Sequence, residues 1–345
     1  MSRLGRLGAV GTVGLGLAAA AIHGPVGADE AFYRNRTVRI VVGYSAGGGF
    51  DFYSRALARH IGRHIPGEPT VVVENMPGAG GLIAANHLYR VARPDGLTVG
   101  HFTGGLLLGQ VLGQKGAEFE ARRFEYVGAP AKEHIACAVT SASGVTSVPE
   151  WRRARAPLKL GGSVPGASQD TATRIVKAAL GLPIQLVTGY RGTAEIRLAA
   201  DSGEIGGACF NWTSMRAGWT EALRAGEVRV VLLATPAPLP ELPGVPLAID
   251  LAPSPEARRL IQVGIHDQGA LARPYVLPPG TPAERVRTLR RAFEATLRDA
   301  VFVAEAERAR LDIDAVPGDE LARIVDRLAE LQPPIRATLR SVLFD

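Results

Sequence analysis

The sequence predicts an α/β protein built from two domains. Apolar runs typical of strands alternate with amphipathic runs typical of helices, which favours sheets of mainly parallel strands covered by helices. Glycine-rich turns follow several strand-like runs, and ligands bind beyond the carboxyl ends of such strands. With 345 residues, the chain is also longer than a single core usually allows.

The N-terminus has the features of a secretory signal. Arg3 and Arg6 precede an uncharged stretch, residues 7–22, and small residues follow up to Ala28. This stretch is shorter and richer in glycine than a membrane span, which needs about 20 strongly apolar residues. We therefore expect residues 1–28 to be a signal peptide that is cleaved near Ala28, leaving the mature protein in an extracytoplasmic space.

The charge of the chain gives no indication of a nucleic-acid partner. Its formal net charge of +6 falls to +4 when Arg3 and Arg6 are removed with the signal. Lysine and arginine form no run long enough for a nucleic-acid-binding arm, and the short basic group 151–155 is typical of a solvated helix edge.

Strand-like and helix-like runs alternate between residue 38 and about residue 130. In the first helix-like run an apolar residue recurs at every fourth position from Tyr53 to Ile65, while Arg55, Arg59 and Arg63 fall on another face. The turns between the runs are short, which favours parallel strands joined by right-handed crossovers. The expected strands are 38–42, 70–73 and 97–102, and the expected helices are 51–65 and 81–92.

A second alternating unit runs from about residue 131 to 250. A cluster of prolines between Pro236 and Pro246 marks where the chain leaves it, and mostly helical segments follow. The expected strands are 135–140, 158–162, 184–187, 205–210, 228–234 and 274–279, and the expected helices are 168–180, 254–263 and two more around 286–297 and 321–331.

The cysteines and histidines offer no metal site. Cys137 and Cys209 lie in apolar surroundings without partners at metal-ligand spacing. They can form a disulfide in an oxidising compartment, but the bond depends on geometry, and buried free thiols are the favoured interpretation. His60 and His64 have helical spacing but lack the glutamate of H-E-x-x-H, so they are interpreted as surface side chains. We expect no metal and no cofactor.

Two glycine turns predict an anion site. The first glycine turn, residues 45–51 (Ser-Ala-Gly-Gly-Gly-Phe-Asp), places bare N–H groups at a helix start, where the helix dipole favours a carboxylate or phosphate. The second glycine turn, residues 75–81 (Asn-Met-Pro-Gly-Ala-Gly-Gly), follows the next strand. Asp51 is expected to cap a helix beginning at Phe52, and its alternative role is to bind an amine or hydroxyl of the ligand.

One alternative is a secreted serine hydrolase. Residues 43–47 (Gly-Tyr-Ser-Ala-Gly) match the G-x-S-x-G nucleophile elbow, with Ser45 as nucleophile. Such an enzyme also needs an acid and a later histidine, for which His266 beside Asp267 is available. The elbow would follow the first mature strand, so no earlier strand and loop could complete the oxyanion hole. We therefore expect no enzymatic activity.

Five segments of the chain resemble the periplasmic substrate receptors of tripartite tricarboxylate transporters, often called Bug receptors. The similarity covers nearly the whole mature chain, and its most specific element is residues 74–81, which match the family signature E-N-x-P-G-A-G-G. The other similar segments are 47–51 (G-G-G-F-D), 94–98 (P-D-G-L-T), 189–192 (G-Y-R-G) and 277–282 (L-P-P-G-T-P).

This resemblance implies a two-lobed periplasmic-binding-protein (flytrap) fold, type II-like, that closes on a small carboxylate or related organic acid between its lobes. Lobe 1 would be discontinuous, combining 29–130 with 249–345, and lobe 2 would be 131–248. The implied partners are the membrane permease subunits of the transporter, and the receptor itself would be a periplasmic monomer. A ligand-sensing receptor for a signalling partner is a further alternative.

The resemblance also implies the binding residues. The ligand carboxylate is expected on N–H groups of the two glycine turns, with lobe 2 closing over it and Arg191 as the candidate for a direct charge pair. The predicted ligand-binding residues are Ser45, Gly47, Gly48, Gly49, Phe50, Asp51, Asn75, Gly78, Ala79, Gly80, Thr103, Ser163, Gly166, Ala167, Ser168, Tyr190, Arg191, Gly192 and Asn211.

Overall fold

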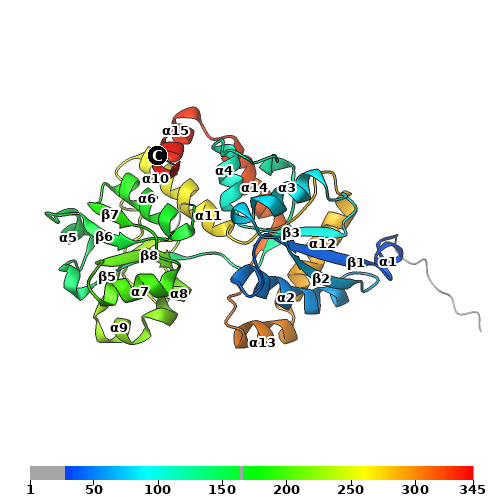
Figure 1. The fold of residues 1–345 in the computed structure, drawn as a ribbon, viewed down its shortest axis with the longest axis horizontal. Coiled ribbons are helices and arrows are strands. Elements are labelled where there is room, and N and C mark those ends of the chain that lie inside the picture. Colours follow the sequence, from blue (N-terminus) through cyan, green and yellow to red (C-terminus); the bar gives the residue numbers. More distant parts are fainter. Residues whose placement is uncertain (1–27, 164–165, 345) are drawn as a thin grey trace, which may run out of the picture.

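The computed structural model describes residues 28–163 and 166–344, which form two α/β lobes lying side by side (Figure 1). The α/β class and the two lobes are as predicted. The expected signal peptide lies outside the described residues except for Ala28, the first residue of α1 (Ala28–Tyr33). In the part of the chain that the structure describes, no helix is long and apolar enough to span a membrane.

The first sheet has the strand order β11-β4-β10-β3-β1-β2. β1 (Thr37–Val42) is parallel to β2 (Thr70–Asn75) on one side and to β3 (Thr98–His101) on the other. The crossovers between these strands contain α2 (Gly49–Ile61) and α3 (Leu82–Arg90), as the alternation of apolar runs predicts.

The other strands of the first sheet run in the opposite direction to their neighbours. β10 (Tyr275–Leu277) is antiparallel to β3 and to β4 (Glu125–Ala129), and β11 (Val316–Pro317) is antiparallel to β4. β10 follows the return of the chain from the other lobe and enters between β3 and β4. The sheet is therefore mixed, which corrects the expectation of a mainly parallel one.

The second sheet is also mixed, because the strand that enters it from the other lobe is antiparallel to its neighbours. Its strand order is β7-β6-β8-β5-β9, and the pairs of β6 with β7 and with β8 are parallel. β5 is the first strand after the chain leaves the first lobe, and it is antiparallel to both β8 and β9. The bounds are β5 (Ile135–Thr140), β6 (Leu158–Gly161), β7 (Ile184–Val187), β8 (Gly207–Asn211) and β9 (Val228–Ala234).

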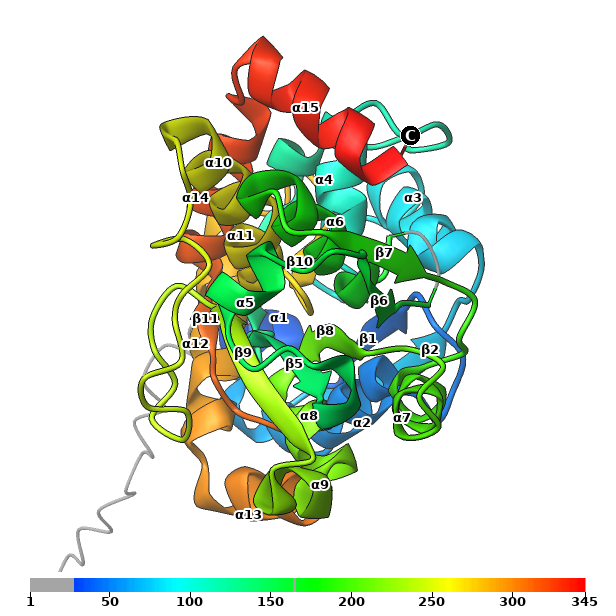
Figure 2. The same cartoon turned by 90° about the vertical axis from the view of Figure 1, so that its left-hand side faces the viewer.

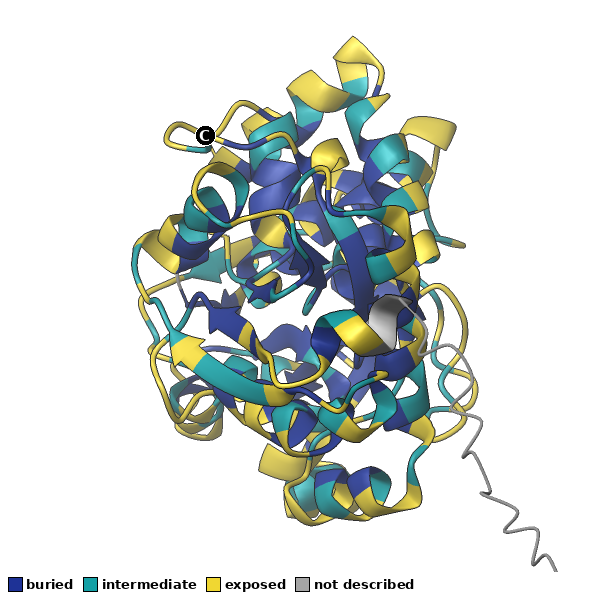
Figure 3. Cartoon of the chain, turned by 90° about the vertical axis from the view of Figure 1, so that its right-hand side faces the viewer, coloured by how far each residue is buried: buried dark blue, intermediate teal, exposed yellow. Residues whose placement is uncertain are grey.

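Helices cover both faces of the second sheet (Figure 2). The helices of this lobe are α5 (Val148–Arg152), α6 (Ser168–Leu180), α7 (Thr193–Asp201), α8 (Trp212–Gly218) and α9 (Thr220–Ala225). Alternate residues of β5 divide between two apolar clusters: Cys137 and Val139 join the cluster of α6, and Ala136 and Ala138 join that of α7 and α8. Figure 3 shows that helices also flank the sheet of the first lobe, whose inner strands are buried and whose edge strand β2 is partly exposed.

The C-terminal helices are divided between the lobes. They are α10 (Pro255–Ile261), the π-helical turn Gln262–His266, α11 (Asp267–Ala270), α12 (Ala283–Arg298), α13 (Ala300–Arg308), α14 (Gly318–Ala329) and α15 (Pro333–Phe344). α12 and α14 pack on β4, whereas α10 and α15 pack on α6 of the second lobe (Figure 1). Leu260 and Leu339 join the apolar cluster of Ile175 there. This packing departs from the expected division, which assigned all of 249–345 to lobe 1.

Cys137 and Cys209 form a disulfide, so the expectation of free thiols is wrong. β5 and β8 are antiparallel neighbours, and their register places Cys137 directly opposite Cys209. Both residues are fully buried on the α6 face of the second sheet. The apolar surroundings that suggested free thiols therefore enclose a cross-link between two strands that are far apart in the sequence.

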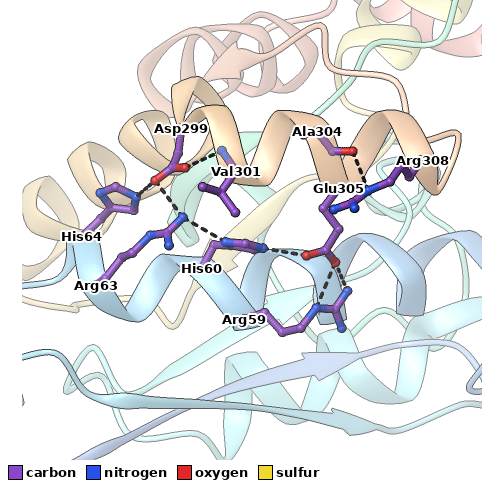
Figure 4. Close-up of polar contacts among 9 residues, drawn as sticks. All are labelled: Arg59, His60, Arg63, His64, Asp299, Val301, Ala304, Glu305 and Arg308. Atoms are coloured by element: carbon purple, nitrogen blue, oxygen red, sulfur yellow. Dashed lines mark hydrogen bonds and ion pairs between the residues drawn. The ribbon is translucent and has the colours of Figure 1, made fainter.

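α13 is attached to α2 by charged side chains (Figure 4). Glu305 of α13 accepts hydrogen bonds from Arg59 and from His60, the latter at 2.7 Å, and His64 bonds to Asp299 at 3.0 Å. His60 is buried, so the interpretation of both histidines as surface side chains is wrong for this one. In the described part of the chain, no group of three or more His, Cys, Asp or Glu residues is arranged to hold a metal ion.

This network gives α13 a pH-dependent attachment. Hydrogen bonds from Arg59 and His60 lower the pKa of Glu305 to about 2. A carboxylate with a lowered pKa in the folded state stabilises the protein above its unfolded pKa and loses this effect as the pH falls toward the folded value. We expect Glu305→Gln to lower the Tm by roughly 1–3 °C at neutral pH. The difference from wild type should narrow between about pH 5 and pH 3 in calorimetry.

Glu307→Gln is the matched control, because Glu307 is exposed on the same helix and has no ion pair with another described residue. We expect its Tm to equal that of the wild type across the same pH range. A Glu305→Gln deficit that stays constant with pH would contradict the stabilising role of the ionised carboxylate.

Candidate functional site

The two glycine turns lie side by side at one edge of the first sheet. β1 and β2 are parallel and in register up to Val42 and Asn75, and the Met76 N–H donates to the Val42 carbonyl at 2.7 Å. Immediately beyond β1, a Cβ added to Gly43 would lie 2.9 Å from the Cα of Gly81, closer than real Cβ atoms approach backbone. Glycine at these positions therefore allows the backbone that enters the first glycine turn to touch the second.

The first glycine turn leaves a row of N–H groups unbonded. α2 begins at Gly49 with Gly48 as its N-cap residue, and no side chain caps it. Among the described residues, the N–H groups of Gly48, Gly49 and Phe50 have no hydrogen-bond acceptor. These groups are oriented by the first turn of a 13-residue helix, so they form an anion-binding surface.

Asp51 braces this turn and does not cap the helix. The helix begins two residues before Asp51, which corrects the expectation that Asp51 precedes a helix starting at Phe52. Its buried carboxylate accepts from the Gly47 N–H at 2.9 Å, from Arg55 Nε and from Asn75 Nδ2 at 3.0 Å. Burial alone would raise the pKa of Asp51, but these hydrogen bonds outweigh it and lower the pKa to about 2. The carboxylate is thus ionised and fully engaged within the protein.

Asn75 links the first glycine turn to the end of β2. Its side-chain amide donates to the Tyr44 carbonyl and to Asp51, and its side-chain oxygen accepts from Arg55. Asp51 and Asn75 were both predicted to be ligand-binding residues. The structure commits both of them to holding the turns in place.

The second lobe repeats this bracing. Asp170 is the third residue of α6, as Asp51 is of α2, and it accepts from the Ser163 N–H at 2.6 Å. Burial raises the pKa of Asp170. The two lobes therefore use the same device, an aspartate in the first helical turn that bonds back to the preceding loop.

The second glycine turn has an unusual backbone. Gly78, Ala79, Gly80 and Gly81 all have positive φ angles, and Ala79, at φ 46°, is one of few non-glycine residues in that region. Such conformations are costly and often occur at binding sites. Ala79 and Gly80 are exposed, so their backbone faces solvent where a ligand can approach.

Tyr44 joins the two glycine turns and was missed in the sequence. Its hydroxyl donates to the Gly80 carbonyl at 3.0 Å and lies near Thr103, and its ring stacks on Phe50 with centroids 4.4 Å apart. Burial raises the pKa of Tyr44, so the hydroxyl remains a donor. Its position between β1 and the first glycine turn was the available signal. The structure therefore brings Phe50, Thr103 and both glycine turns together.

The turn before α6 reaches toward this edge from the second lobe. The Gly166 carbonyl lies 3.7 Å from a Cβ built on Gly105, the first residue of α4 (Gly105–Val111). Gly166 and Ser168 are exposed and Ala167 is partly exposed, whereas Ser163 is buried and its hydroxyl accepts from Gln169. Residues 164–165 lie outside the described residues.

The remaining predicted residues of the second lobe are bonded within that lobe. The Arg191 side chain is 89% exposed and pairs with Glu195 at 2.6 Å, and the Tyr190 hydroxyl donates to Glu204. Gly192 is the N-cap residue of α7. Asn211 caps α8 through its side-chain oxygen, while Phe210 and Trp212 are buried.

The serine hydrolase alternative gains no support. Ser45 is exposed, and both ring nitrogens of His266 are buried without a hydrogen-bond partner among the described residues. Burial lowers the pKa of His266 to about 4. A nucleophile elbow requires a hydrogen bond between the serine and its histidine, and Ser45 and His266 do not make one.

These features define a class of protein. Two α/β lobes face each other, and braced glycine turns with unbonded N–H groups lie where the lobes approach. This is the arrangement of a two-lobed solute-binding protein.

Comparisons with known proteins agree with this class. A crystal structure of a TctC solute-binding protein from Polaromonas has a TM-score of 0.71 at 19% identity, covering 90% of this chain and 98% of that one. MatC from Rhodopseudomonas palustris with bound malate has a TM-score of 0.60 at 20% identity, covering 89% and 99%. The R. palustris protein Rpa4515 with adipate has a TM-score of 0.61 at 23% identity, covering 89% and 97%.

The sequence comparisons give the family. The UPF0065 protein in gbd 5'region of Cupriavidus necator is 43% identical over 91 residues, so the match spans about a quarter, 26%, of each chain. The family model for the tripartite tricarboxylate transporter family receptor matches residues 55–337. The chain belongs to this family, and the resemblance seen in its motifs is confirmed.

Proposed function

We propose that this chain is a periplasmic receptor that binds a small carboxylate between its lobes and delivers it to a tripartite tricarboxylate-type membrane permease. The observation that carries the proposal is the meeting of two glycine turns at one sheet edge, with the N–H groups of Gly48, Gly49 and Phe50 unbonded among the described residues. Family membership and the malate and adipate bound to two related structures support a carboxylate as ligand.

The location in the periplasm rests on two features of this chain. The N-terminal stretch has the composition of a signal peptide, cleaved near Ala28. The Cys137–Cys209 disulfide is typical of proteins that fold in an oxidising compartment. The receptor acts as a monomer, with the permease subunits as its protein partners and no catalytic activity of its own.

Binding works through a shift between open and closed lobes. A carboxylate on the first and second glycine turns offers new contacts to the turn before α6, so the closed state gains affinity that the open state lacks. The predicted contacts are the N–H groups of Gly48, Gly49 and Phe50, which are unbonded among the described residues, and the backbone of Gly78, with Thr103 and Ser168 at the sides. Asp51 braces the first glycine turn and Asp170 braces the loop before α6. Little conformational ordering of these two loops is therefore needed when the ligand binds.

A ligand screen tests this function. We expect the mature chain to be stabilised by at least one carboxylate in a panel of malate, adipate, citrate, amino acids and aromatic acids. A ligand at 100 times its Kd adds about 2.7 kcal/mol of stability, which corresponds to a rise in Tm of roughly 4–5 °C for a chain of this length. The amides of the same acids are the control and should give no shift. A panel in which no acid raises the Tm would contradict carboxylate binding.

A further inference from the structure

Arg273 is a cation that lies directly against the first glycine turn. It belongs to the segment between α11 and β10, which returns the chain to the first sheet. A Cβ built on Gly49 would be 3.3 Å from its Nη1 atom and 3.9 Å from its Cζ atom, so the guanidinium lies against the bare backbone. The Cζ atom is 4.9 Å from the ring centroid of Phe50 and 5.4 Å from that of Tyr53.

Among the described residues, Arg273 makes no hydrogen bond, so its donors are unused there. Its side chain is 23% exposed, and its one ion pair within this part of the chain is with Glu133, at a loose 3.5 Å. A guanidinium carries five N–H donors in a planar fork that matches a carboxylate. The cation–π contact with Phe50 positions the guanidinium without consuming any of these donors.

The charged groups around Arg273 leave its guanidinium available to bind an anion at the first glycine turn. Asp51, the nearest acid in the turn, is already paired with Arg55 at 2.9 Å. His101 stacks near Phe50, and burial, together with the charge of Arg273, lowers its pKa to about 3, so it is neutral. Arg191, which the sequence favoured for a charge pair with the ligand, donates its Nε hydrogen to Glu195.

We infer that Arg273 binds a carboxylate of the ligand directly and that Glu133 is the internal anion with which the ligand competes. This inference rests on the proposed function and extends it, because it assigns recognition of charge to one side chain where the glycine turns offer only backbone. Glu133 lies in the first connection between the lobes and Arg273 in the second. The ligand therefore replaces a contact between the two connections.

The competition predicts effects of opposite sign in two variants. Arg273→Gln removes the cation and should weaken the binding of the best acid among malate, adipate and citrate by about 10- to 100-fold in calorimetry. Arg273→Lys keeps the charge but not the fork, so it should recover part of the loss. Glu133→Gln removes the competing anion and should tighten binding by roughly 2- to 5-fold.

Arg224→Gln is the matched control, because it removes an exposed arginine of α9 that pairs with Glu221 and is not among the predicted binding residues, and its affinity should equal that of the wild type. A purely structural role for the Arg273–Glu133 pair predicts that both single variants weaken binding together. Glu133→Gln with unchanged or weaker affinity would overturn the inference, as would Arg273→Gln with wild-type affinity. If the wild type binds none of the acids, the proposed function itself fails. Should Arg273→Gln not fold, Arg273→Lys and Glu133→Gln still give the answer.

Discussion

Gly48→Val is expected to weaken carboxylate binding by about 100-fold, as loss of two hydrogen bonds to a charged group at about 1.5 kcal/mol each would do. Gly48 has φ −96° and ψ 173°, which valine adopts readily, and the nearest atom to an added Cβ is the Ser45 carbonyl oxygen at 3.8 Å. The side chain therefore fits the folded protein, but its methyl groups occupy the space above the N–H groups of Gly49 and Phe50.

The stability of this variant separates binding from folding. Valine is a poorer N-cap residue than glycine, so the Tm of the ligand-free protein should fall by only a few degrees, for a cost of about 1 kcal/mol. Gly218→Val is the control, because Gly218 is exposed at the end of α8 with an added Cβ 3.6 Å from the Arg197 side chain. Its affinity should not change. Equal affinity in Gly48→Val and wild type would exclude the first glycine turn as the carboxylate site.

Loss of the Cys137–Cys209 disulfide is expected to lower the stability of the protein more than Glu305→Gln or Gly48→Val. The two cysteines are 72 residues apart in the sequence, so the bond closes a long loop in the unfolded chain. The loop-closure estimate is about 4 kcal/mol, or roughly 6–8 °C in Tm for a chain of this length. Calorimetry of Cys137→Ala, Cys209→Ala and the double variant measures this directly.

The three cysteine variants serve as controls for one another. Either single substitution removes the cross-link, so all three should lose similar stability, with small differences from the cavity each alanine leaves. Ligand affinity should stay near the wild-type value, because the bond lies on the α6 face of the second sheet and outside the glycine turns. Double-variant stability equal to that of the wild type would show that the bond is absent from the folded protein.

Local patterns in the sequence were enough for much of the fold. The helix 168–180 and the strands 184–187 and 228–234 agree with α6, β7 and β9, because amphipathic period and β-branched runs are properties of short segments. The two glycine turns could also be predicted from the local sequence, since only glycine supplies bare backbone at a helix start. Short helices such as α8 and α9 were missed, because segments of six or seven residues carry too little periodicity.

The site required knowledge of contacts between distant segments. Asp51 looked like a helix cap because its neighbours in sequence suggested one, whereas its partner Asn75 lies at the end of β2, in a distant part of the sequence. Arg273 carries no motif, and only the return of the chain beside β3 places it against Gly49. Arg191 looked like the cation that binds the ligand, but it forms an ion pair with Glu195, four residues further along the chain.

Residues close together in the chain were sufficient to predict the α/β class, most of the helices and strands, and the two glycine turns. The folded structure was needed to establish the antiparallel strands β5 and β10, the disulfide, the packing of α10 and α15 on α6, and the placement of Arg273. Each of these depends on a contact across the fold, and the free energy of such a contact is set by burial and geometry that local pattern does not contain.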